Sequence, residues 1–199
     1  ILLGHGHLGL ALLEGLASTD HVIIEGVLRW SQQTSTSSHN FYDKTEQLFS
    51  KRIKELGLKE VKSGGGNTYE FIKTLQILKP DILLVGSWGE VLKPHTLSFP
   101  NMTAINCHPS KLPKHRGANP YSSSIVTGET ESGISFHLIS QDIDAGPILL
   151  QQTVPIHKTD TGGDLRQRCA VPIQPKGWFL SFFINYKKTL LNQCRKITL

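Results

Sequence analysis

The sequence predicts an α/β fold with a mostly parallel, twisted sheet and helices on both of its faces. Three observations predict it: short apolar runs alternate with helical patterns, the run at residues 82–85 is apolar throughout, and a glycine-rich turn joins the first run to the first helix. A continuous apolar run is typical of a strand covered on both faces. Alternating strands and helices predict parallel strands with right-handed crossovers and ligands bound at the carboxyl ends of the strands.

Length and composition indicate one globular domain. The chain has 199 residues, of which 38% are hydrophobic and 19% charged, which suits one packed core and excludes a disordered or coiled-coil chain. No apolar run reaches the roughly 20 residues that span a bilayer, and the first residues lack the charged lead of a signal peptide. The three cysteines form no CxxC pair. We therefore expect a cytoplasmic protein without a membrane span, an export signal or a disulfide framework.

The net charge of +5 is concentrated near the end of the chain. Residues 1–150 contain 13 Lys and Arg against 14 Asp and Glu, whereas residues 151–199 contain 8 against 2. A cationic surface steers anions toward itself, so one interpretation is a phosphate-bearing partner. The other interpretation is a basic helix that is exposed to solvent.

The first part of the chain alternates strand and helix. A strand at residues 2–3 leads through the glycine turn into a helix rich in Leu and Ala, and residues 22–28 form the second predicted strand. The polar stretch 31–40, rich in Ser and Thr, predicts a loop. A helix is expected over residues 44–56, where a following glycine ends it.

Start and stop signals place the later elements. Asn67 stands three residues before Glu70, a spacing close to that of a capping box, so we expect Asn67 to cap a helix that continues to about residue 78. Asn119, followed by Pro120, predicts the start of another helix. The remaining predicted elements are strands at 82–85, 105–108, 133–139 and 148–155, and helices near residues 160–165 and 179–186.

Gly4, Gly6 and Gly9 match the G-x-G-x-x-G fingerprint of dinucleotide-binding folds, and they stand between a strand and a helix as that motif requires. The acidic residue that would bind the ribose is missing, and Arg29 and Trp30 stand at the end of the second strand instead. An arginine there could accept a 2′-phosphate, so an NADPH-dependent reductase is one hypothesis. The other is that the glycines only allow close packing of strand and helix.

Asn106 and His108 lie at the end of a predicted strand. The period of two along a strand puts both side chains on one face and Cys107 on the opposite face. An amide and an imidazole then point together into the crevice at the strand ends. Cys107 points away from His108, which argues against a Cys–His nucleophilic pair. His108, His115 and His137 lack regular ligand spacing, which argues against a metal site.

Three motifs occur in a characteristic order: Asn106-x-His108-Pro109-Ser110-x-Leu112-Pro113 with Arg116-Gly117, then Thr130-x-Ser132-Gly133, then Asp144-x-Gly146-Pro147-Ile148. Together they resemble the folate-dependent formyltransferases, a family that includes methionyl-tRNA, glycinamide ribonucleotide (phosphoribosylglycinamide) and nucleotide-sugar N-formyltransferases. The resemblance is dense from about residue 79 to residue 156 and weaker toward both ends. It implies a Rossmann-like formyltransferase fold.

By this resemblance, the formyl donor is 10-formyltetrahydrofolate, the acceptor is a primary amine, and no metal is needed. Asn106 and His108 would face the oxygen that becomes negatively charged, the first as a hydrogen-bond donor and the second as an imidazolium. Asp144 would keep His108 protonated and help to move the amine proton through water. Taken singly, each residue also has an ordinary structural explanation, such as a turn or a strand-end histidine.

The resemblance also suggests where the two substrates bind. In the family, the pterin ring lies against the loop after the central strand and against the aspartate loop. The expected folate contacts are therefore Gly86, Trp88, Gly89, Glu90, Leu92, Gln141, Asp142 and Ile143. Trp88 fits a stacking role and a core position equally well. The expected acceptor contacts are Ser110, Lys111, Arg116 and Gly117, whose cations suit a phosphate-bearing acceptor.

The sequence leaves the acceptor open between branches of the family. Arg116-Gly117-x-x-Pro120 resembles the methionyl-tRNA and amino-sugar branches, whereas the short length resembles the glycinamide ribonucleotide branch. We expect residues 1–199 to form a single catalytic domain without the C-terminal OB-type barrel of methionyl-tRNA formyltransferases, acting on a small-molecule or tRNA-linked amine. Two hypotheses of other classes are the NADPH-dependent reductase and a non-catalytic, folate-binding member of the fold.

Overall fold

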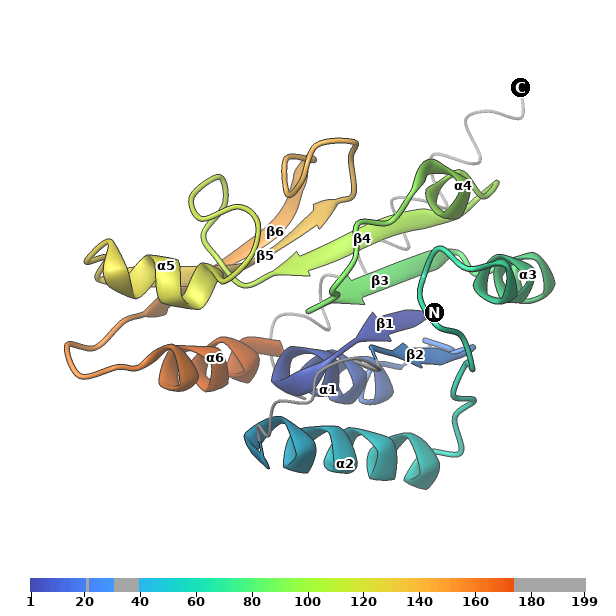
Figure 1. Ribbon diagram of the computed structural model, residues 1–199, viewed down its shortest axis with the longest axis horizontal. Helices are drawn as coiled ribbons and strands as arrows, with labels where there is room; N and C mark the ends of the chain where they lie inside the picture. Colours follow the sequence, from blue (N-terminus) through green and yellow to red (C-terminus); the bar gives the residue numbers. More distant parts are fainter. Residues whose placement is uncertain (21, 31–39, 174–199) are drawn as a thin grey trace.

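The computed structural model describes residues 1–20, 22–30 and 40–173. Its centre is a six-stranded sheet in the order β2-β1-β3-β4-β5-β6 (Figure 1). Strands β1 to β4 run parallel, whereas β5 pairs antiparallel with β4 and β6 antiparallel with β5. The prediction of a mostly parallel α/β sheet is confirmed. The strands are β1 (Leu2–Gly4), β2 (Val27–Arg29), β3 (Ile82–Gly86), β4 (Thr103–His108), β5 (Glu131–Leu138) and β6 (Ile148–Pro155).

Helices cover both faces of this sheet, because alternate residues of the central strands point to opposite sides. Leu2 and Leu84 pack in one cluster with residues of α1, α2 and α6, and Figure 1 shows these three helices together on one side of the sheet. Leu3 and Val85 pack in a second cluster with residues of α3. Strand β3 is therefore apolar at every position. The helices are α1 (Gly6–Ala17), α2 (Asn40–Glu55), α3 (Tyr69–Leu78), α4 (Pro94–Leu97), α5 (Pro120–Val126) and α6 (Gly162–Ala170).

The start of α3 differs from the prediction. Thr68 caps the helix, with its side chain accepting a hydrogen bond from the backbone N–H of Phe71 at 3.3 Å. Asn67, the predicted cap, instead accepts the N–H of Lys93 at 2.7 Å and donates to the carbonyl of Val91 at 2.9 Å. Because these partners lie more than twenty residues away, the local spacing could not reveal them.

Other boundaries also shift. The second strand contains only Val27–Arg29, and α2 begins at Asn40, four residues before its predicted start. Asn119 precedes α5 as predicted, but its side chain makes no capping hydrogen bond. The predicted loop up to residue 39, the helix over 179–186 and the basic residues beyond 173 lie outside the described residues.

Two cysteines are buried free thiols. Cys107 lies in β4 and Cys169 in α6, and burial raises the pKa of Cys169 to about 12 and that of Cys107 well above its usual value. A thiol is nucleophilic only as the thiolate, so burial disfavours the reactive form of both. Within the described part of the chain, each helix is too short or too polar to cross a membrane.

Candidate active site

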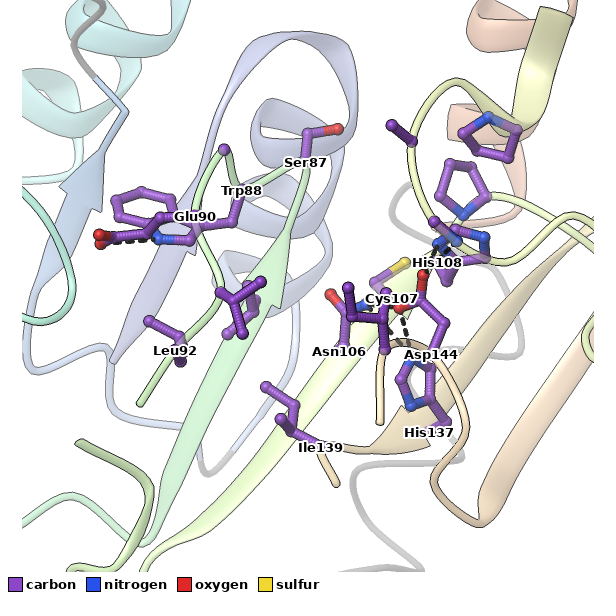
Figure 2. A pocket seen from close by; sticks show the side chains of 18 of the residues that line it. Ser87, Trp88, Glu90, Leu92, Asn106, Cys107, His108, His137, Ile139 and Asp144 are labelled. Atoms are coloured by element: carbon purple, nitrogen blue, oxygen red, sulfur yellow. Dashed lines mark hydrogen bonds and ion pairs between the residues drawn. The ribbon is translucent and has the colours of Figure 1, made fainter. Parts of the chain in front are cut away.

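A cleft of about 480 Å³ opens where β1, β3 and β4 end (Figure 2). One wall consists of residues 87–92 after β3 and the other of residues 139–144 after β5. The starts of α1 and α5 close its remaining side. The cleft thus lies at the carboxyl ends of the parallel strands, where an open α/β sheet commonly binds ligands, and its volume is in the range of small-molecule sites.

Asn106 and His108 line this cleft from the last residues of β4. Antiparallel pairing with β5 places His137 opposite Asn106 and Ser135 opposite His108. Between them, Cys107 is 1% exposed and belongs to the hydrophobic core. The alternation along β4 therefore separates two polar side chains in the cleft from a thiol in the core, as the period of two predicts.

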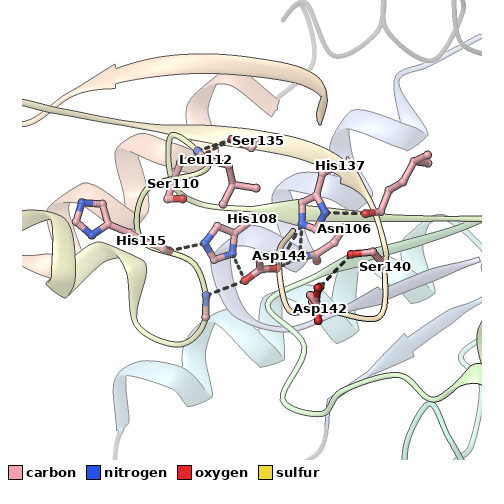
Figure 3. Close-up of polar contacts among 12 residues, drawn as sticks. Asn106, His108, Ser110, Leu112, His115, Ser135, His137, Ser140, Asp142 and Asp144 are labelled. Carbon is pink, nitrogen blue, oxygen red and sulfur yellow. Dashed lines mark hydrogen bonds and ion pairs between the residues drawn. The ribbon is translucent and has the colours of Figure 1, made fainter. Parts of the chain in front are cut away.

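Asp144 joins these groups, as Figure 3 shows. Its Oδ1 accepts a hydrogen bond from Asn106 Nδ2 at 3.0 Å and lies 3.3 Å from His137 Nε2. Its Oδ2 lies 3.2 Å from His108 Nδ1 and accepts the backbone N–H of Gly117 at 2.9 Å. One carboxylate thus holds together β4, β5 and the loop before α5.

Both ring nitrogens of His108 face oxygen acceptors. Nδ1 faces the Asp144 carboxylate, and Nε2 donates to the carbonyl of His115 at 2.8 Å. This geometry favours the doubly protonated imidazolium, since each acceptor needs an N–H. Burial acts in the opposite direction and lowers the pKa of His108 below its usual 6.5, while the Asp144 charge and the His115 carbonyl counter that effect.

Asp144 is ionised at neutral pH. Burial alone would raise its pKa, but the hydrogen bond with His137, the charge of His108 and the Gly117 amide together hold that pKa below its usual 3.8. The side chain is only 11% exposed. A nearly buried carboxylate with this many donors therefore fixes the orientation of each donor.

His137 also belongs to this group of side chains, although the sequence analysis considered it only as a possible metal ligand. Its Nδ1 donates to the carbonyl of Leu138 at 2.9 Å, and its Nε2 lies 3.2 Å from Asn106 Nδ2. The pairing of β4 with β5 creates this contact, and neither strand alone indicates it. In the ranges that the structure describes, no group of three or more His, Cys, Asp or Glu is placed to hold a metal ion.

A family model described as formyl transferase matches residues 19–175. The chain belongs to the formyl transferase family. The match covers more than half of the chain, including Asn106, His108 and Asp144, and it confirms the resemblance found in the sequence motifs.

Proteins similar to this chain include ones named methionyl-tRNA formyltransferase and ones named phosphoribosylglycinamide formyltransferase. A methionyl-tRNA formyltransferase of Thermotoga neapolitana is 37% identical over 114 residues, which are 57% of this chain and 36% of that protein. One from Methylacidiphilum infernorum is 29% identical over 174 residues, 85% of this chain and 52% of that protein. The chain therefore spans from about a third to about half the length of these curated relatives.

Solved structures named phosphoribosylglycinamide formyltransferase resemble the chain in fold. The phosphoribosylglycinamide formyltransferase from Anaplasma phagocytophilum superposes with a TM-score of 0.69 and 25% identity, covering 91% of this chain and 84% of that one. The enzyme of that name from Streptococcus pneumoniae has a TM-score of 0.72 at 17% identity, covering 93% of this chain and 96% of that one, which shows the shared fold.

Most of the folate contacts expected for this formyl transferase family member line the cleft, namely Trp88, Gly89, Glu90, Leu92, Gln141, Asp142 and Ile143. Gly86 does not. A Cβ atom there would lie 2.3 Å from the side chain of Leu12, so Gly86 serves the packing of β3 against α1. Its contact with folate stays a prediction.

Trp88 and Glu90 support the wall of the cleft. The Trp88 ring packs edge-on against Trp30, with 5.0 Å between ring centroids, and its Nε1 donates to Glu90 at 3.3 Å. The Glu90 carboxylate also accepts the N–H of Gly66 and a bond from Asn67 Nδ2. These contacts tie the loop after β3 to the loop before α3, so the Glu90 carboxylate is already engaged within the protein.

Three of the four expected acceptor contacts lie outside the cleft. Ser110 is fully buried and donates to the carbonyl of Lys114 at 2.7 Å, and Lys111 forms an ion pair with Glu131. Arg116 is exposed on the loop and does not line the cleft, whereas Gly117 does. The loop residues are adjacent in sequence, but only Pro109 and residues 117–119 line the cleft, whereas residues 110–116 do not.

The start of α1 contains an internal ion-pair network where the fingerprint suggested a dinucleotide. Glu46 accepts the N–H of Gly6 at 2.6 Å and lies 3.0 Å from His5 Nδ1. Arg29, the candidate for a 2′-phosphate, contacts Glu46 at 3.1 Å and Glu60 at 2.6 Å. The cation that the NADPH hypothesis requires is therefore already ion-paired with two carboxylates.

Close packing accounts for the glycine spacing instead. A Cβ atom on Gly9 would lie 2.8 Å from the backbone of Gly4 and 2.8 Å from the ring of Phe49. Such distances are far shorter than real van der Waals contacts. Gly4 and Gly9 thus allow β1, α1 and α2 to approach one another.

Proposed function

We propose that this chain transfers a formyl group from 10-formyltetrahydrofolate to a primary amine. The observation that carries the proposal is the convergence of Asn106, His108 and Asp144 at one side of the cleft, with contacts of 3.0 and 3.2 Å to the carboxylate. Membership of the formyl transferase family supports it. The donor would supply the formyl carbon that the amine attacks.

Asn106 and His108 would stabilise the negative charge that develops on the formyl oxygen. Both side chains line the cleft, so a formyl oxygen bound there would lie beside them, and Asp144 contacts each of them from the same side chain. Removing one such donor typically costs roughly 2.7–4 kcal/mol of activation free energy. Asp144 would hold both donors in place and accept the amine proton through water.

The cleft also suits the donor by size and polarity. Val91 and Ile143 line it from its two walls and are 63% and 57% exposed. Apolar side chains left uncovered inside a cleft gain free energy when a ligand covers them, at about 25 cal/mol per Å². A flat heterocyclic ring between these walls would obtain that gain while hydrogen-bonding to the backbone of both loops.

The names of the relatives support two acceptor classes. A tRNA-linked amine leads, because the curated relatives at 37% identity are methionyl-tRNA formyltransferases. The amino-sugar amine rests on the Arg116-Gly117-x-x-Pro120 motif. Phosphoribosylglycinamide is the second candidate, since the structure of the enzyme so named covers 91% of this chain. Both acceptor classes carry phosphate groups as well as the reactive amine.

An acceptor screen with 10-formyltetrahydrofolate tests the proposal. Initiator methionyl-tRNA, glycinamide ribonucleotide and several amino-sugar nucleotides are offered, and release of tetrahydrofolate is measured. We expect one acceptor to react and His108→Ala to lower the rate roughly a hundredfold or more, while circular dichroism shows that the fold is kept. Donor binding without turnover for any acceptor, or an undiminished rate in His108→Ala, would contradict the proposal and favour a non-catalytic folate-binding protein.

A further inference from the structure

The wall of the cleft at residues 87–92 is a loop without regular secondary structure, and it ends at Lys93, just before α4. Figure 2 shows Trp88 and Leu92 of this wall on one side of the cleft and Asp144 on the other. A loop has no ladder of backbone hydrogen bonds of its own, so contacts with other segments have to hold its shape. The segment before α3 supplies such contacts.

Gly65, Gly66 and Asn67 lie directly behind this wall, and we call them the backing segment. They do not line the cleft themselves. A Cβ atom on Gly66 would lie 2.6 Å from the side chain of Leu92, and one on Gly65 would lie 2.8 Å from the carboxylate of Glu90. Both distances are far shorter than a van der Waals contact. The two glycines therefore allow the backbone of the backing segment to touch side chains of the wall.

The side chain of Asn67 bonds to the wall and to the residues that follow it. Its Nδ2 donates to the carbonyl of Val91 at 2.9 Å and to the carboxylate of Glu90 at 3.2 Å. Its Oδ1 accepts the backbone N–H of Lys93 at 2.7 Å and the hydroxyl of Thr96 at 3.1 Å. An amide side chain has two N–H groups and one oxygen with two lone pairs, so each of these is used. One side chain thus holds the second half of the wall and the start of α4.

The Glu90 carboxylate completes the connection from the side of the wall. Its Oε1 accepts the N–H of Gly66 and the Nε1–H of Trp88, the latter at 3.3 Å, and its Oε2 accepts Asn67 Nδ2. Hydrogen bonds to an ionised group are roughly twice as strong as those between neutral groups. Without the Asn67 amide, this half-buried carboxylate loses one of its donors and the carbonyl of Val91 loses its partner.

We propose that Asn67 is a positioning residue for the formyl donor, which it does not touch. It fixes the wall against which the donor would lie, and a preformed wall spares the ligand the cost of ordering the loop on binding. The hydrogen bonds of the Asn67 side chain go to the wall and α4, and not to Asn106, His108 or Asp144, which belong to β4 and the opposite wall. The identity of the ligand rests on the proposed function, whereas the fixing of the wall does not.

Tetrahydrofolate binding, measured by isothermal titration calorimetry on the full chain, is the first test. We expect Asn67→Ala to weaken binding at least about tenfold, since holding even one loop residue in a single conformation costs about that factor. Asn67→Asp keeps the acceptor oxygen but loses both N–H groups and places a second carboxylate beside Glu90, so it should weaken binding as well. This second variant keeps the test valid should the alanine variant not fold.

Thr68→Ala is the matched control. Thr68 is the next residue in the chain and caps α3, but its side chain bonds to Ser63, Gly65 and Phe71 rather than to the wall. Its loss should lower the stability of the protein by about 1 kcal/mol and leave tetrahydrofolate affinity within about twofold of wild type. Unchanged affinity in both Asn67 variants, or an equal loss of affinity in Thr68→Ala, would overturn the assignment.

Kinetics separate this inference from the proposed function. With the best acceptor, Asn67→Ala should raise the KM for 10-formyltetrahydrofolate at least about tenfold and leave kcat and the acceptor KM within about twofold. A merely structural role would instead lower the amount of folded enzyme, and so kcat, at an unchanged KM. If wild type transfers no formyl group yet tetrahydrofolate binding depends on Asn67, the proposed function fails and the positioning role stands. If transfer proceeds and the donor KM is the same without Asn67, the positioning role fails alone.

Discussion

The ends of β1 and β4 contain similar groups in different arrangements. At β1, the Glu46 carboxylate contacts the Gly6 amide, His5 and Arg29, at 2.6 to 3.1 Å. At β4, the Asp144 carboxylate contacts donors that themselves line the cleft. In the first network His5 and Gly6 line the cleft, but the carboxylate of Glu46 and the cation Arg29 do not. In the second network the Asp144 carboxylate lines the cleft together with its donors, which makes it the better candidate active site.

The charge balance of the two networks also differs. Arg29 is a permanent cation between two carboxylates, Glu46 and Glu60, so its charge is fully matched. Asp144 stands between His108 and His137, whose charges depend on protonation. The ion pairs of Arg29 therefore keep their charges at neutral pH, whereas the contacts of Asp144 with histidines depend on the protonation of those rings.

The largest expected effect is the loss of turnover in Asp144→Asn, a change in the network at β4. An amide keeps the size of the side chain but cannot hold His108 protonated or accept the amine proton, so we expect turnover to fall roughly a hundredfold or more. Tetrahydrofolate release with the best acceptor measures this effect, and circular dichroism checks the fold. Turnover near the wild-type value would show that Asp144 only orders the loop.

Gly9→Ala should have its effect at β1 on stability alone. Its Cβ would lie 2.8 Å from the Gly4 backbone, and such overpacking costs about 1–3 kcal/mol of unfolding free energy. Gly64→Ala is the control, because its nearest neighbour would be 4.0 Å away. Urea unfolding measures both variants. A folded Gly9→Ala protein with normal stability but lost turnover would mean that the glycine turn serves the reaction.

Glu46→Gln should weaken the network at β1 without changing catalysis. Burial would raise the pKa of Glu46, but His5, the Gly6 amide and Arg29 together hold it below 4.5, so the ionised form stabilises the folded state. We expect a loss of about 1 kcal/mol at pH 7, with kcat unchanged. The difference from wild type should shrink as pH falls through the folded pKa, below 4.5. Unfolding curves at several pH values measure it, and a difference that grows in acid would contradict this ionisation.

The smallest expected effect is on the titration of His108. Burial lowers the pKa of His108 below 6.5, and the Asp144 charge partly opposes that shift. In Asp144→Asn that opposition is removed, so the pKa should fall further and the imidazolium should be lost at lower pH than in wild type. NMR titration of the His108 ring measures both values. An unchanged or higher pKa in the variant would show that the carboxylate does not stabilise the protonated ring.

Local sequence patterns predicted those features of the site that depend only on residues close together in the chain. The period of two placed Asn106 and His108 on one face of β4 because the pleat alone decides it. The partner of Asn106 across the sheet, His137, was missed, since the register of β4 with β5 depends on how two distant segments pair. The same reason explains Asn67, which bonds to the segment before α4 instead of capping α3.

By itself, the sequence determined the α/β class, the strand and helix types and the formyl transferase family, because these depend on periodicity, turn residues and motifs within short spans. Tertiary structure alone decided which polar groups face the cleft. It directed Glu46 to the start of α1, buried Ser110, paired Lys111 with Glu131 and brought Arg166 into the cleft from α6. Each of these outcomes depends on contacts between segments far apart in the chain, and such contacts form only when the sheet and its helices pack together.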